Sequence, residues 1–177
     1  KMTRAPKTEA AENETSEALE RVSIDIGGPF KWATIGGALY YLVIVDNFTS
    51  YKWVFPIAEK GQAFDRLSKW INRAERQSGK RVKIIRTDGA QELQGAELRA
   101  LANSLGIEIE VSPPHSPFCN GVAERANRTL REVAAASLKN FGGTLDPRLW
   151  VYAYKVAAYL RNHLGLTEIA DSESGNE

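Results

Sequence analysis

The sequence predicts an α/β domain in which three strands come first and helices then alternate with strands. Two patterns predict it. Early in the chain, β-branched and aromatic residues form short runs, one of them with the strict alternation of a half-buried strand. Further along, apolar residues recur at intervals of three and four, the period of an amphipathic helix. A chain of 177 residues, of which 43% are hydrophobic, is long enough to bury one core.

The first part of the chain is expected to form three strands, at residues 21–27, 38–46 and 51–57. In the first strand Val22 and Ile24 lie on one face, and Ser23 and Asp25 lie on the other. The second and third strands are separated by a short polar link, which predicts a hairpin.

Helices and further strands follow in alternation. The four expected helices cover residues 62–77, 98–105, 122–141 and 147–164, and the two expected strands cover residues 82–86 and 107–111. Gly79 and Gly106 come directly after two of the helices, where glycine commonly ends a helix. Asp146 and Pro147 favour the start of the last helix, as a cap and a first residue.

A core flanked by two polar segments is the expected organisation of the chain. Residues 1–19 and 165–177 are expected to be a linker and a tail, both disordered, and residues 20–164 form the core. Residues 21–164 hold 20 basic and 13 acidic side chains, a balance that permits a polyanionic partner. No apolar run is long enough to span a membrane. The single cysteine excludes an internal disulfide, and this favours a reducing, intracellular location.

Three carboxylates lie in or beside predicted buried elements, where an unpaired acid would cost free energy. Asp25 lies within the first strand, Asp88 follows a buried strand, and Glu124 opens a helix after a proline-rich loop. Acids in or beside a sheet need a partner or a metal ion. Three converging carboxylates offer the hard oxygen ligands that suit Mg²⁺ or Mn²⁺. Phosphodiester chemistry uses such sites, with two ions about 3.5–4 Å apart.

The helix that carries Glu124 also has a basic face. With about 100° of rotation per residue, Arg128 and Arg131 fall on the same side as Glu124. The opposite side carries the apolar residues Val122, Ala126, Leu130 and Val133. The arginines are therefore candidates for phosphate binding. The alternative is a solvated helix face with an ordinary Glu–Arg pair.

Four segments around these residues resemble a known family. They are Ser23–Phe30, Val45–Trp53, Ile85–Gly89 and Asn120–Leu130, and the last is the most specific. They resemble the copia-type retrotransposon integrase core, of the retroviral integrase superfamily. The 35 residues between the second and third acids are the gap typical of these enzymes. The resemblance covers residues 20–164 and implies a ribonuclease H-like fold, a five-stranded mixed sheet flanked by helices.

The resemblance also implies a function. A polynucleotidyl transferase of this family joins the 3′ ends of retrotransposon cDNA to target DNA, using two Mg²⁺ or Mn²⁺ ions per active site. In this chain the metal ligands and catalytic residues would be Asp25, Asp88 and Glu124. Candidates for DNA contact are Asn120, Gly121, Arg125, Arg128 and Arg131. The expected partners are the element's DNA ends, target DNA and at least one further copy of the chain. The expected location is a cytoplasmic particle before integration and the nucleus during it.

Departures from the family pattern leave two alternatives open. Gly89 and Ala90 stand where the family usually shows Asn-Gly, and Cys119 stands where it usually has glutamine. The family's integrases also carry an N-terminal His/Cys zinc module, so this chain is expected to be a fragment without it. The alternatives are a related ribonuclease H-like nuclease and a host-retained, non-catalytic DNA-binding or scaffolding module.

Several other residues are expected to have structural roles only. Asp46 should bind local backbone in a turn rather than a metal ion. The tryptophans at positions 53, 70 and 150 lie within apolar patterns, which indicates core positions. His115 and Cys119 are interpreted as loop residues, and His163 as a helix-end residue.

Overall fold

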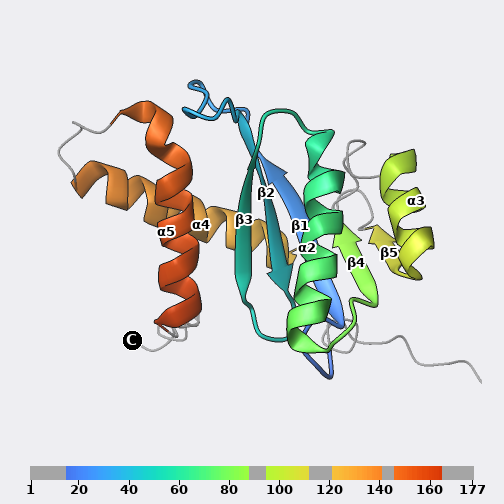
Figure 1. Ribbon diagram of the computed structural model, residues 1–177. Helices are drawn as coiled ribbons and strands as arrows, with labels where there is room; N and C mark the ends of the chain where they lie inside the picture. The colour runs from blue at the N-terminus through green and yellow to red at the C-terminus, as the bar shows by residue number, and fades with distance from the viewer. Residues whose placement is uncertain (1–14, 88–94, 112–120, 141–145, 165–177) are drawn as a thin grey trace, which may run out of the picture.

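Strand β1 (Arg21–Gly27) lies at the centre of a five-stranded mixed sheet (Figure 1). The computed structural model describes residues 15–87, 95–111, 121–140 and 146–164. The other strands are β2 (Tyr40–Asp46), β3 (Lys52–Ile57), β4 (Ile84–Thr87) and β5 (Glu108–Val111). The order across the sheet is β3-β2-β1-β4-β5. β1 pairs antiparallel with β2 and parallel with β4, so the sheet is mixed, as predicted.

The helices also agree with the periodicity of the sequence. They are α2 (Gln62–Ser78), α3 (Ala96–Leu105), α4 (Gly121–Asn140) and α5 (Trp150–His163). Gly79 and Gly106 follow α2 and α3 with φ of 70° and 68°, a left-handed conformation that glycine adopts without strain. The last predicted helix begins one turn later than expected, because residues 147–149 form a 3₁₀ turn capped by Asp146.

The alternation along β1 divides the interior into two cores. Val22 and Ile24 pack under α2 and α3 on one face of the sheet, together with Leu67 and Ile71 of α2. Ser23 and Asp25 alternate with these residues and belong to the opposite face, which α4 and α5 cover. The central strand therefore presents its polar side chains to α4.

Helices α4 and α5 form the second layer through small and aromatic residues. Ala126 and Leu130 of α4 are buried with Trp150 and Tyr154 of α5. At the edge of the sheet, the Asn162 side chain accepts from the Lys52 backbone N–H (2.9 Å) and donates to the Lys52 carbonyl (2.8 Å). These bonds tie the end of α5 to an otherwise open strand edge.

The ordered core begins before the expected boundary at residue 20. Leu19 is buried among the residues under α2, and its backbone N–H donates to the Asp46 carboxylate at 3.0 Å. Glu17 forms ion pairs with Lys80 (2.5 Å) and Lys83 (3.0 Å). One buried leucine and two ion pairs hold this part of the predicted linker in place. The expected disorder of the outer linker and of the tail concerns residues 1–14 and 165–177, which lie outside the described residues.

The helices of the described segments are all too short or too polar to cross a membrane.

Replacing Leu130 with alanine tests how much the α4 layer stabilises the fold. Leu130 is fully buried between α4 and the sheet. We expect Leu130→Ala to lower the free energy of unfolding by about 2–5 kcal/mol, through lost burial and a residual cavity. Leu164, 60% exposed beyond the end of α5, provides the matched control, and its alanine variant should change stability by less than about 0.5 kcal/mol. Urea unfolding followed by tryptophan fluorescence measures both; equal midpoints would contradict the packing described.

Candidate metal and nucleic-acid site

Hydrogen bonds from β1 and from α4 hold the carboxylate of Asp25. Its Oδ1 accepts from the backbone N–H of Ile26 at 2.7 Å. Its Oδ2 accepts from the side-chain amide of Asn127, which comes from α4. The first donor belongs to the strand and the second to the helix packed on it. The carboxylate is therefore oriented by the contact between β1 and α4.

Asn127 is in turn held by a tyrosine of the neighbouring strand. The Tyr41 hydroxyl of β2 donates to Asn127 Oδ1 at 3.0 Å. Both residues are buried, and Asn127 is only 6% exposed. Burial, with a smaller effect of the adjacent Tyr154, raises the pKa of Tyr41, so its hydroxyl keeps its proton and remains a donor. The sequence alone assigned neither residue a role, although a polar residue on the buried side of α4 was a signal that could have found that of Asn127.

Glu124 lies one helical turn from this contact. It is exposed in the first turn of α4, three residues before Asn127. Residues three apart on a helix have Cβ atoms about 5–6 Å from each other. Asn127 touches Asp25, so Glu124 stands one helical turn along α4 from the residue that contacts the other predicted ligand.

Asp88, the third predicted ligand, lies outside the described residues. Its neighbour Thr87 is the last residue of β4 and pairs with Ile24, next to Asp25 in β1. Among the residues that the structure does describe, no three His, Cys, Asp or Glu side chains form a group suited to a metal ion. The described part of the chain therefore contains two of the three predicted ligands, Asp25 and Glu124.

An ion-pair cluster joins β1, β4 and β5 on the face of the sheet that carries Asp25. Glu110 accepts from Arg21 at 3.0 Å and from the Arg86 guanidinium at 2.7 Å. Arg86 is aligned with Ser23 on one side and with Glu110 on the other. The cluster fixes the end of β4 that leads to position 88.

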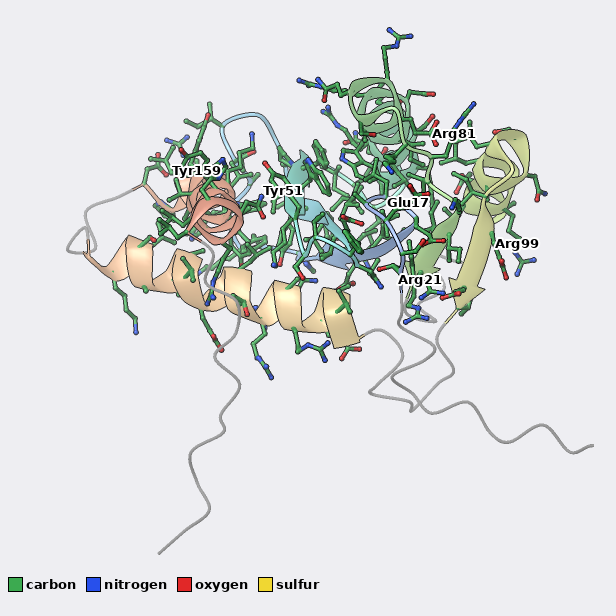
Figure 2. The ribbon with its side chains drawn as sticks, turned by 90° about the horizontal axis from the view of Figure 1, so that it is seen from below. Glu17, Arg21, Tyr51, Arg81, Arg99 and Tyr159 are labelled. Carbon is green, nitrogen blue, oxygen red and sulfur yellow. The ribbon has the colours of Figure 1, made fainter. Side chains whose placement is uncertain are left out.

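The outer face of α4 is basic, as predicted. Arg125, Arg128 and Arg131 are all exposed. In Figure 2, nitrogen-tipped side chains project from α4 away from the sheet. Arg125 folds back over the start of the helix, where a Cβ at Gly121 would lie 2.7 Å from its Nη1. Asn120, the remaining candidate for DNA contact, lies outside the described residues.

The residues interpreted as structural behave as expected where the structure describes them. Asp46 accepts from the backbone N–H groups of Leu19 and Thr49, which confirms a turn role. Trp70 and Trp150 are buried, and Trp53 packs partly buried against the same core as Trp70. His163 ends α5, with Nδ1 2.8 Å from the Tyr159 carbonyl. His115 and Cys119 lie outside the described residues.

Comparison with known proteins relates the chain to mobile genetic elements. Residues 15–117 match the family model for the integrase core domain. The retrovirus-related Pol polyprotein from transposon TNT 1-94 of Nicotiana tabacum is 33% identical over 144 residues, 81% of this chain and 11% of that protein. The corresponding polyprotein from transposon RE2 of Arabidopsis thaliana is 30% identical over 154 residues, 85% of this chain and 10% of that protein. The chain thus spans about a tenth of the length of these relatives.

A solved structure confirms the fold class. One chain of the cryo-EM structure of a simian T-cell lymphotropic virus intasome, in complex with the PP2A regulatory subunit B56 gamma, matches with a TM-score of 0.65 and 22% identity. The match covers 85% of this chain and 51% of that one. The five-stranded mixed sheet with its flanking helices is therefore the predicted ribonuclease H-like fold.

Two substitutions on α4 compare how much the buried Asn127 amide and the exposed Glu124 carboxylate contribute to stability. Asn127→Ala removes both hydrogen bonds of a buried side chain and leaves the Tyr41 hydroxyl without its acceptor. We expect a loss of about 1–3 kcal/mol in the free energy of unfolding. Glu124→Gln, on the exposed side of the same helix, should change it by less than about 0.5 kcal/mol. Metal-free chemical denaturation measures both, and an equal effect of the two would show that Asn127 does not secure α4.

Proposed function

This chain belongs to the integrase core domain family, and on that basis we propose that it is the catalytic core of a retrotransposon integrase. The proposed reaction is polynucleotidyl transfer, in which the 3′-hydroxyl of an element's DNA end attacks a phosphodiester of target DNA in one in-line step. The new P–O bond forms as the bond to the target strand's 3′ oxygen breaks, and that oxygen leaves as a hydroxyl after a proton equivalent to the one lost by the attacking group is taken up. One observation carries the proposal. The carboxylate of Asp25 is oriented from α4 by Asn127, one helical turn from Glu124.

The donor set suits a hard divalent cation. Asp25, Asp88 and Glu124 would hold Mg²⁺ or Mn²⁺ through carboxylate oxygens, the ligands these ions prefer. The hydrogen bonds from Ile26 and Asn127 orient the two oxygens of Asp25, which would present a fixed carboxylate to the cation. When bound, a pair of such ions would stabilise the attacking and leaving oxygens.

The arginines of α4 would hold the DNA backbone beside this site. Arg128 and Arg131 are exposed on the helix that carries Glu124, so phosphates near the carboxylates would come within their reach. Guanidinium groups bind phosphate oxygens in a bidentate manner and carry no base specificity in such contacts. Target choice would therefore depend on backbone contacts and DNA deformability.

A second copy of the chain is the other proposed partner. Tyr152, Val156 and Tyr159 of α5 are exposed large apolar residues at intervals of four and three, so they share one helix face. A row of exposed apolar side chains is typical of interaction surfaces. It supports association of copies, which two-ended integration would require.

Removing any one of the three charges should abolish joining. Asp25→Asn, Asp88→Asn and Glu124→Gln keep the shape of each side chain but lose the negative charge that holds the cation. We expect strand transfer by the full-length integrase to fall to background in a gel assay with Mg²⁺ or Mn²⁺. Asp65→Asn, at an exposed acid on α2, is the matched control and should remain active. A ligand variant with the wild-type rate would exclude that residue, and shortened DNA without joined product would favour the nuclease alternative.

The arginine face should contribute salt-dependent, sequence-independent DNA affinity. Each lost phosphate contact lowers the slope of log affinity against log salt by about 1. The double variant Arg128→Ala, Arg131→Ala should therefore lower the slope by about 2, equally on different sequences. Arg73→Ala, Arg76→Ala on α2 is the matched control, because these exposed arginines lie on the other face of the sheet. Fluorescence anisotropy from low to moderate salt measures the slopes, and parallel lines for wild type and the α4 variant would remove these residues from the DNA site.

A further inference from the structure

The chemistry of Asp25 dictates the direction of the hydrogen bonds that lead away from it. An ionised carboxylate only accepts hydrogen bonds, so the Asn127 amide must present its NH₂ group to Asp25. The amide oxygen then points to Tyr41 and needs a donor, which the Tyr41 hydroxyl supplies at 3.0 Å. Tyr41, Asn127 and Asp25 thus form a chain with a single donor-to-acceptor direction.

The Tyr41 ring fits against the sheet because the residue opposite it, Gly27, has no side chain. Gly27 is the cross-strand partner of Tyr41 and stands two residues after Asp25, on the same face of β1. A Cβ at Gly27 would lie 2.2 Å from Tyr41 Cζ and 2.4 Å from its hydroxyl oxygen. The phenol ring therefore lies across the backbone of Gly27. A side chain there would displace the hydroxyl from Asn127.

Aromatic residues, most of them from α5, pack against the Tyr41 ring. The Tyr41 ring centroid lies 4.7 Å from that of Tyr154 and 6.2 Å from that of Trp150, both in α5. Phe30 lies 5.9 Å from Tyr41 and stacks on Trp150 at 3.8 Å. Held between these rings and the glycine backbone, the hydroxyl has little freedom to move.

We propose that Tyr41 is a positioning residue for the metal ligand Asp25 and acts through the buried amide of Asn127. The inference rests on the proposed function, since it takes Asp25 to be a metal ligand. The Tyr41 hydroxyl fixes the Asn127 amide, and the amide fixes Asp25 Oδ2. The Asp25 carboxylate is thereby held in one orientation before a cation arrives, so less conformational freedom is lost on binding.

A variant without the hydroxyl isolates this role. Tyr41→Phe keeps the ring and its aromatic contacts but leaves the buried Asn127 oxygen without its donor. The amide can then rotate, and Asp25 loses a fixed partner. Residues that hydrogen-bond to metal ligands typically contribute 10–100-fold in metal affinity. Because Tyr41 acts through one intervening residue, we expect the dissociation constant for Mn²⁺ to rise by about three- to tenfold.

Mn²⁺ titration of the whole chain, with free Mn²⁺ measured by electron paramagnetic resonance, tests the inference. Tyr40→Phe is the matched control, because it makes the same chemical change at the next residue of β2, on the opposite face of the sheet. Wild type and Tyr40→Phe should bind alike, and Tyr41→Phe should bind more weakly at a temperature where circular dichroism shows all three to be folded. Equal affinity of all three overturns the inference.

Two further measurements separate this inference from the function it rests on. Asp25→Asn should lose Mn²⁺ binding; if it binds like wild type, Asp25 is not a ligand, and both proposals fail at that step. If Asp25→Asn loses binding while Tyr41→Phe keeps it, only the role of Tyr41 fails. In strand transfer by the full-length integrase, Tyr41→Phe should need about three- to tenfold more Mn²⁺ for half-maximal rate and recover at saturation. A lower rate that Mn²⁺ does not restore would indicate a structural role and overturn positioning.

Discussion

The seating of α4 on the polar side of β1 is the contact on which the site depends. A central strand must bury both faces, and one face of β1 carries Ser23 and Asp25. Buried polar groups are costly unless they find partners. Ser23 donates to Asn47 at 2.8 Å, and Asp25 accepts from Asn127 of α4. The helix is therefore held to the sheet by a polar bond as well as by Leu130, and that bond fixes its position relative to Asp25.

The same arrangement links the aromatic core to the carboxylates. Trp150 donates to the Trp32 carbonyl at 2.9 Å and stacks on Phe30, which anchors the start of α5. Tyr41 touches this cluster with its ring and Asn127 with its hydroxyl. A change in the packing of α5 would therefore reach Asp25 through only two hydrogen bonds. Close-packed interiors transmit such displacements because they contain few voids to absorb them.

Local periodicity was enough to predict the elements, but long-range partners were not accessible to it. The alternation of Val22 and Ile24 located β1, and the spacing of Ala126 and Leu130 located α4. Asn127 was missed because a count of apolar positions passes over a buried amide between them. Tyr41 was missed because its role depends on Gly27 and Asn127, which are adjacent to it only after folding. Arg21 and Glu110, 89 residues apart, illustrate the same limit. The extension of the core to Leu19 escaped prediction because a single leucine in a polar segment has no period.

The inner and outer faces of α4 have different roles, and dissolved salt affects the outer face only. Its inner face holds Asn127 in a buried hydrogen-bonded chain, which dissolved salt does not reach. Its outer face holds Arg128 and Arg131 in solvent, where ions screen charges beyond about 10 Å at 0.1 M salt. Salt should therefore weaken the proposed DNA contacts of this face while leaving the orientation of Asp25 unchanged. Loss of the hydrogen bonds through Asn127 should disturb the orientation of Asp25 at every salt concentration. Because 3.6 residues make a turn, Glu124 lies near both sets, between the buried amide at i+3 and the exposed arginine at i+4. The proposed cation site thus lies where the salt-insensitive face and the salt-sensitive face of the helix meet.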